Sequence, residues 1–173
     1  MELSKAIRER RSVRRFESKP VKKEDLTKIL DAARWAPSAG NMQPLELIIV
    51  EKKEIKRQLA EAALGQAFVA DVPLDIVVCA NLERSSRRYG KRGSELYAIQ
   101  DTAAAAQNIL LMAHALGYAT CWVGAFNEKI VSNIIEAPKN VRPLAIIPVG
   151  KPAEKPSPPT RRSLEEITHE DKF

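Results

Sequence analysis

The chain has 173 residues, of which 45% are hydrophobic and 29% charged, enough for one ordinary globular domain with its own core. Two Cys and two His leave too little for a disulfide scaffold or a common zinc site, so we expect no bound metal. Side chains for acid–base catalysis are also few, and we expect any enzymatic chemistry to come from a bound cofactor.

The net charge of +6 is confined to one end of the chain. Residues 1–23 carry nine Lys or Arg and three Glu, whereas basic and acidic residues number nineteen each from Glu24 onward. A local basic cluster on a neutral body indicates a local anionic partner, and phosphate is the obvious candidate. Three acidic residues in this segment count against a mitochondrial targeting peptide and no secretory signal follows, so we expect a cytoplasmic protein.

The first 44 residues predict two helices followed by a loop. Residues 3–10 form a short amphipathic pattern, and residues 11–19 break it and are expected to be extended. A clear helical stripe covers residues 23–35, with Glu24 and Asp25 at its positive end and Pro37 closing it. Residues 37–44, PSAGNMQP, are rich in turn formers.

The middle of the chain alternates apolar runs with charged segments. Residues 45–50 and 74–80 predict buried strands, separated by a surface helix over 52–64. Residues 81–94 hold five cationic residues and two Gly, which is typical of a mobile loop or a frayed helix.

The longest helix is expected over residues 95–116. No charged residue occurs between Thr102 and Asn127, a length that could span a bilayer, but Gln107, His114 and Gly117 interrupt the apolar run. We therefore expect a helix buried on more than one side, with a subunit interface supplying the second side, and no membrane partner.

The last third of the chain predicts a strand over 119–123, a helix capped by Asn127 and running to 135, and a strand over 144–149. Residues 151–173 have little core-forming pattern and are expected to dangle or to wrap across a neighbour. This order of elements predicts a mixed α/β sandwich. Because neither GxGxxG nor GxxxxGK[ST] occurs, side chains would have to bind any phosphate.

Two further segments could hold a ligand besides the basic run Arg10–Phe16. Arginine binds phosphate through paired N–H groups and Ser12 adds a neutral donor. The alternatives for this run are a solvated basic surface or a nucleic-acid site, although aromatic residues are scarce. The loop 37–44 offers polar groups at a strand end, and Gly124 in CWVGAF would let a flat ligand approach the backbone. His114 is expected to be a core residue.

Taken together, these segments resemble the nitroreductase family of FMN-dependent oxidoreductases that use NADH or NADPH. The resemblance covers nearly the whole chain in order, and it lies in RRSVRRF (10–16), AARWAPSAGNMQP (32–44), QDTAAAAQNILLMAHALG (100–117), CWVGAF (121–126), IIPVGKP (146–152) and RRSLEEITHEDKF (161–173).

The resemblance implies an α+β fold, an α-β-α sandwich with a central mixed sheet of four to five strands, in a single domain over 1–173. It implies a homodimer with FMN at the subunit interface and the arm 151–173 packed on the partner. It implies no catalytic side chain, because the flavin N5 carries the hydride. The implied FMN-binding residues are Arg10, Arg11, Ser12, Arg14, Pro37, Ser38, Ala39, Asn41, Gln66, Val123, Gly124, Ala125, Arg161 and Arg162.

Within that set the resemblance implies distinct roles. Arg10, Ser12 and Arg14 would bind the phosphate and ribityl chain, completed by Arg161 and Arg162. Residues 37–39 would lie against the flavin of the other subunit, with Asn41 supporting their loop. Gln66 would reach the polar edge of the ring, and the N–H of Gly124 would meet N5.

The implied reaction is ping-pong transfer of electrons from NAD(P)H to a small acceptor such as a nitroaromatic, a quinone or free flavin. Two features depart from the family: Ala39 stands where a hydroxyl residue is common, and the substrate-shaping insertion is reduced to residues 81–94. A reductive dehalogenase or flavin-consuming enzyme of the same fold, a non-catalytic flavin store, and a basic anion- or nucleic-acid-binding module remain alternatives.

Overall fold

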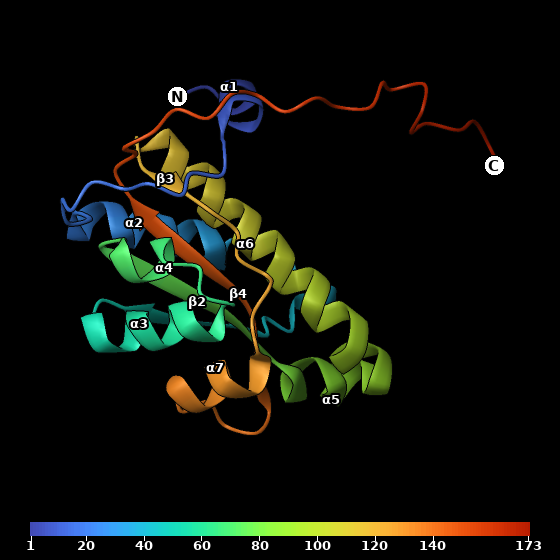
Figure 1. Ribbon diagram of the computed structural model, residues 1–173. Helices are drawn as coiled ribbons and strands as arrows, with labels where there is room; N and C mark the ends of the chain where they lie inside the picture. Colours follow the sequence, from blue (N-terminus) through green and yellow to red (C-terminus); the bar gives the residue numbers. More distant parts are fainter.

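The computed structural model describes residues 1–173 as one four-stranded sheet with helices on both faces (Figure 1). The strands are β1 (Leu45–Val50), β2 (Leu74–Asn81), β3 (Ala119–Thr120) and β4 (Val141–Gly150), in the order β1-β2-β4-β3. The sandwich and the four strands are confirmed. The three pairings between these strands are all antiparallel, and the parallel component of the sheet is a single bridge between Ser12 and Thr120.

The predicted helices form within a few residues of the expected bounds. The helices are α1 (Leu3–Glu9), α2 (Lys23–Arg34), α3 (Lys53–Ala62), α4 (Phe68–Asp71), α5 (Leu82–Arg92), α6 (Ala98–Ala115) and α7 (Glu128–Ile134). The short α4 was not predicted, because four residues carry too little periodicity. The strand expected over 119–123 is only two residues long, although Val123 still bridges Ile146.

Residues 81–94 are a helix rather than a mobile loop. The Asn81 side chain accepts the Arg84 N–H at the helix start, and Glu83 pairs with Arg87 one turn on. The helix breaks at Gly90, whose φ of 52° and ψ of −140° only glycine adopts readily. A single π-helical turn, Gly93–Tyr97, then leads into α6.

The two faces of the sheet build two separate cores. In β2, Ile76 and Val78 point to one face, where α2 and α6 pack, whereas Val77 and Cys79 point to the other face. The second core is closed by Leu59 of α3 and by residues of α7. This alternation follows from the two-residue period of a strand buried on both sides.

The helix α6 packs its buried residues against α2 and the sheet as a core helix, consistent with its low charge. The structure contains no helix with the length and apolarity needed to cross a membrane.

The C-terminal arm starts on the N-terminal segment of its own chain. Phe16 and Pro152 form a bridge, Ala153 N–H donates to the Arg15 carbonyl at 2.9 Å, and Arg14 N–H donates to the Glu154 carboxylate at 2.6 Å. From Ser157 onward every residue is exposed, and the arm extends away from the body (Figure 1).

Candidate functional site

The basic segment runs beside the short strand β3. Ser12 bridges Thr120 and the Val13 N–H donates to the Thr120 carbonyl at 3.0 Å, while the Val13 side chain is buried. Since alternate residues of an extended chain point to opposite sides, Ser12 and Arg14 share the side opposite Val13. The fold therefore presents these side chains together beside the sheet edge.

Arg10 carries a charge that no carboxylate offsets. Its side chain is half-buried and forms no hydrogen bond or ion pair, and its pKa is lowered by burial and by the neighbouring Arg11 and Arg161 guanidiniums. Arg161, in the exposed C-terminal arm, is therefore within electrostatic range of Arg10. A half-buried cation repelled by two others favours binding of an anion.

The side chains of Arg11 and Arg162 both donate hydrogen bonds to backbone carbonyls. The Arg11 guanidinium donates to the carbonyls of Arg8 and Arg10 at the end of α1, and Arg162 donates to the Glu166 carbonyl within the arm. The Arg162 contact lies within the arm, whereas Arg11 stays beside Arg10 and lines the same pocket.

Cys121 joins these groups beneath the surface. Burial raises its pKa, while Arg14, a hydrogen bond from Ser12, and Arg10 act in the opposite direction. The net increase keeps a neutral, buried thiol, so Cys121 serves to pack the base of the cluster rather than to react.

The backbone that follows Cys121 has a free hydrogen-bond donor, the N–H of Gly124. Val123 is held to Ile146 by two hydrogen bonds of 2.9 and 3.0 Å, after which Gly124 and Ala125 are exposed. The Gly124 N–H donates to no group of the protein. A Cβ at Gly124 would meet nothing closer than 3.7 Å, the distance to the Trp122 Nε1, so a flat ligand has room over this backbone.

Gln66 lies beside the 123–125 backbone. Its side-chain amide donates to the Ala63 carbonyl at 2.9 Å and to the Ala125 carbonyl at 3.3 Å. These bonds use the N–H groups of the side-chain amide, so its oxygen remains free to accept a hydrogen bond beside the 123–125 backbone.

The loop 37–44 is a rigid structure held from within. The Ser38 hydroxyl oxygen accepts the Gln43 N–H at 3.0 Å, and the Asn41 N–H donates to the Ser38 carbonyl at 2.9 Å. Gly40 and Asn41 both have positive φ, 53° and 57°. Asn41 thus supports the loop through its backbone N–H, and the Ser38 hydroxyl oxygen accepts a hydrogen bond within the same loop.

Asp101 of α6 anchors this loop and was missed by the sequence analysis. One of its carboxylate oxygens accepts the Ala39 N–H at 3.0 Å, and the other is buried with no partner. Burial raises its pKa, partly opposed by the Ala39 hydrogen bond. The available signal was its position as the last acidic residue before an uncharged stretch of a buried helix.

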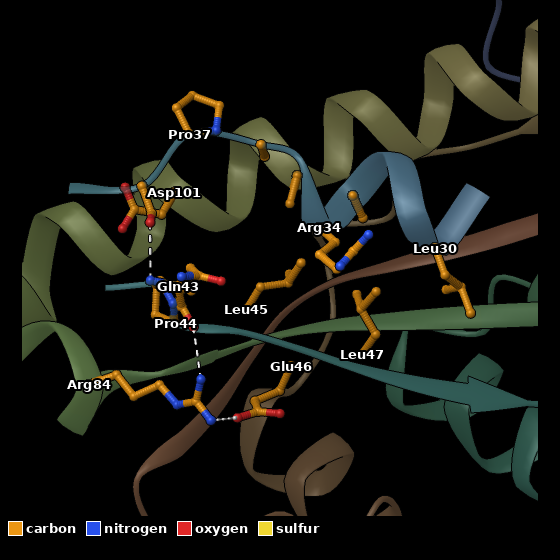
Figure 2. Close-up of a pocket in the computed structure, with 14 residues that line it drawn as sticks. Leu30, Arg34, Pro37, Gln43, Pro44, Leu45, Glu46, Leu47, Arg84 and Asp101 are labelled. Carbon is orange, nitrogen blue, oxygen red and sulfur yellow. Dashed lines mark hydrogen bonds and ion pairs between the residues drawn. The ribbon is translucent and has the colours of Figure 1, made fainter. Parts of the chain in front are cut away.

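A pocket lies beside the loop, between α2, β1, α5 and α6 (Figure 2). The Arg84 guanidinium crosses its edge, donating to the Gln43 carbonyl at 3.2 Å and approaching the Glu46 carboxylate at 3.6 Å. Ala33 and Ala105 from the first core form its apolar floor.

The predicted site residues therefore fall into two groups. One group holds Arg10, Ser12, Arg14 and the 123–125 backbone, and its Cys121 and Val123 belong to the core on the α3 and α7 face. The other group is the loop from Pro37 to Asn41, which adjoins the core on the α2 and α6 face. Within one chain the loop contacts Asp101 in the first turn of α6, whereas Arg10 lines a pocket with His114 in the last turn, so the two groups lie at opposite ends of this helix.

His114 lies nearer the basic cluster than expected for a core residue. It lines a pocket with Arg10 and Arg11, its Nε2 is buried without a partner, and burial lowers its pKa. The same pocket is lined by Thr120, whose hydroxyl also has no partner.

The fold is an α+β sandwich with an arginine cluster at a sheet edge, and comparisons with known proteins specify the family. The nitroreductase family model matches residues 7–80 and 64–151. A Methanothermobacter thermautotrophicus protein described as a candidate NADH dehydrogenase/NAD(P)H nitroreductase is 35% identical over 90% of this chain and 80% of its own.

Two further similarities agree. The FMN reductase [NAD(P)H] of Bacillus subtilis is 29% identical over 99% of this chain and 74% of its own. The crystal structure of a nitroreductase family protein from Clostridium novyi NT matches with a TM-score of 0.81 at 34% identity, covering 91% of this chain and 89% of that one. The chain belongs to the nitroreductase family.

Proposed function

We propose that this protein is an FMN-dependent oxidoreductase that takes electrons from NADH or NADPH and passes them to a small acceptor such as a nitroaromatic, a quinone or free flavin. Family membership and relatives named for FMN reduction and nitroreduction support the proposal. The observation that carries it is the presence in one chain of Arg10, a half-buried cation with no ion-pair partner, and of the free N–H of Gly124.

The residues present fit FMN at both ends. Arg10, Ser12 and Arg14 offer guanidinium and hydroxyl donors for a phosphate, and Arg161 adds a cation close to Arg10. The position suits a planar ring, because Gly124 itself carries no side chain and the Trp122 ring comes no closer than 3.7 Å to the position of a Cβ.

When bound, FMN would supply the hydride-accepting and hydride-donating chemistry, which the side chains of this protein do not offer. The chain would contribute binding and polarity. We assign the Gly124 N–H as donor to the ring, Val123 and Ala125 as its lining, and Gln66 as the acceptor at its polar edge.

We further propose that the working unit is a homodimer. One flavin contacting both the Arg10 group and the loop 37–41 would have to lie between two copies, because these groups lie beside His114 and Asp101, at opposite ends of α6 and about 20 Å apart along it. The apolar groove lined by Leu3, Ala6, Trp35, Leu111 and Met112, together with the exposed arm 151–173, offers surface for a second copy. Each chain would then form a single domain whose arm packs on its partner.

Steady-state kinetics tests the reaction. Initial rates with NADPH or NADH and a quinone acceptor should give parallel double-reciprocal lines, because donor and acceptor use the same slot in turn. Intersecting lines would contradict ping-pong transfer. Sedimentation analysis should show a dimer, and removal of residues 161–173 should reduce dimerisation or FMN retention; a truncated protein that stays dimeric and fully loaded would contradict the role of the arm.

We place the protein in the cytoplasm, where the reduced nicotinamide nucleotides are available and the thiols of Cys79 and Cys121 stay reduced. The acceptor is a small molecule, with no nucleic-acid or membrane partner.

A further inference from the structure

The helix α5 carries five cationic side chains, and they differ in whether a carboxylate neutralises them. Three are paired with carboxylates: Arg84 with Glu46, Arg87 with Glu83, and Lys91 with Glu95. Arg88 and Arg92 have no carboxylate within ion-pair distance, although acidic side chains are available to their neighbours on the same helix. Two exposed guanidiniums thus keep their full charge and most of their N–H donors.

Both free guanidiniums border one aromatic pair. The rings of Tyr89 and Tyr97 meet edge to face, with centroids 5.1 Å apart. The guanidinium carbon of Arg88 lies 5.5 Å from the Tyr89 ring centroid, and Arg92 Nε donates to the Tyr97 hydroxyl oxygen at 2.9 Å. Because that oxygen accepts from Arg92, its own proton remains free to donate.

This cluster touches the loop that adjoins the proposed flavin site. A Cβ built on Gly40 would overlap the Tyr89 hydroxyl oxygen and lie 3.0 Å from Arg88 Nη1. Gly40 therefore permits α5 to pack directly on the loop 37–44. Arg88 thus lies directly against the loop, and Arg92 is linked to it through the Tyr97 and Tyr89 rings.

We propose that Arg88 and Arg92, with the Tyr97 hydroxyl, form a binding site for a phosphomonoester of the substrate. Two guanidiniums and a hydroxyl donor match a group that carries nearly two negative charges at neutral pH. The inference rests on the proposed function, which offers two sources of this group: the 2′-phosphate of NADPH, which NADH lacks, and the 5′-phosphate of free FMN as acceptor, which riboflavin lacks.

The test uses the FMN-loaded protein with Arg88→Gln, Arg92→Gln and the double variant. Arg87→Gln is the matched control, since it removes the same charge from the same helix but from a residue already paired with Glu83. Calorimetry gives the dissociation constants of NADP⁺ and NAD⁺. The ratio of the two nucleotide constants measures the preference for the 2′-phosphate. Initial rates with FMN and with riboflavin as acceptor, using NADH as donor, give a second ratio, which measures the preference for the acceptor phosphate.

For the 2′-phosphate, the wild type binds NADP⁺ more tightly than NAD⁺, and each substitution reduces that preference about tenfold, as expected for one charge-assisted contact. For the acceptor phosphate, the NADP⁺ to NAD⁺ ratio stays constant and the preference for FMN over riboflavin falls instead. The proposal is overturned if neither ratio changes in the double variant, or if Arg87→Gln changes them equally. Failure of the proposed function would look different, because the protein would then take up no FMN at all.

Discussion

Replacing Arg10 by Ala should weaken FMN binding without weakening the fold. In the free protein the Arg10 charge is disfavoured, because burial and the neighbouring guanidiniums of Arg11 and Arg161 both lower its pKa. Removing the side chain therefore relieves repulsion, and we expect the unfolding midpoint to stay the same or to rise slightly. The loss should appear only when the phosphate must be bound.

The size of the loss follows from the burial of each arginine. A charge-assisted hydrogen bond contributes about 1.5–3 kcal/mol, which corresponds to about a 10- to 150-fold rise in the FMN dissociation constant. Arg10 is half-buried and should lie towards the upper end, whereas Arg14 is exposed, is screened by solvent and should lie at the lower end. Arg10→Lys should recover only part of the loss, because an ammonium cannot form the paired contact.

Arg15→Ala is the matched control. It removes the same charge one residue further along, but Arg15 is exposed, and an extended chain points it away from Ser12 and Arg14. Titration of apoprotein with FMN at two salt concentrations, followed by flavin fluorescence, measures all four variants. Wild-type affinity in both Arg10→Ala and Arg14→Ala, or an equal loss in Arg15→Ala, would refute the assignment of the phosphate site.

Three further predictions concern single residues. Gly124→Ala should leave the unfolding midpoint unchanged, since its Cβ meets nothing within 3.7 Å, yet raise the FMN dissociation constant about tenfold by holding the ring off the backbone; an unchanged constant would contradict the ring position. Asp101→Ala should speed hydrogen exchange of the Ala39 amide, whereas Asp101→Asn keeps an acceptor and its protection; equal exchange in both would remove the anchoring role. Asp75 is fully buried, and burial raises its pKa well above the usual value despite Lys56, so the folded state binds more protons and the free energy of unfolding falls as pH rises from about 4 through the folded-state pKa. Asp75→Asn should flatten that dependence in urea titrations, and an unaltered slope would show that another group causes it.

Much of the fold could be predicted because its elements obey local rules. The apolar run of β2 predicts a strand buried on both faces, and the stretch of α6 without charges beyond Asp101 predicts a buried helix; the structure has both. The Asn127 side chain caps α7 as expected, accepting the Ile130 N–H. The helix α5 was ambiguous because it is mostly charged, and its stability comes from the Asn81 cap and side-chain pairs along its surface. An open loop and a helix of this kind differ little in sequence pattern.

Some residues of the candidate site could be found from sequence motifs, whereas others depend on contacts that only the fold creates. The arginine run and the glycine of CWVGAF are visible as motifs, and the fold places Arg10, Ser12 and Arg14 around Cys121. Contacts between distant segments, such as Asp101 with Ala39 and Tyr89 with Gly40, depend on tertiary packing and carry no local signal. The hydrogen bonds from Arg11 to the carbonyls of Arg8 and Arg10 likewise depend on where α1 ends, which the sequence pattern gives only to within a residue or two.

The most direct test of the central claim is the visible absorption spectrum of the purified protein, recorded without oxygen before and after addition of NADPH or NADH. We expect an oxidised-flavin spectrum, present on purification or after loading with FMN, that bleaches with at least one of the two nucleotides. A protein that is colourless after incubation with FMN and removal of the unbound flavin, or a bound-flavin spectrum that neither nucleotide bleaches, would contradict this function.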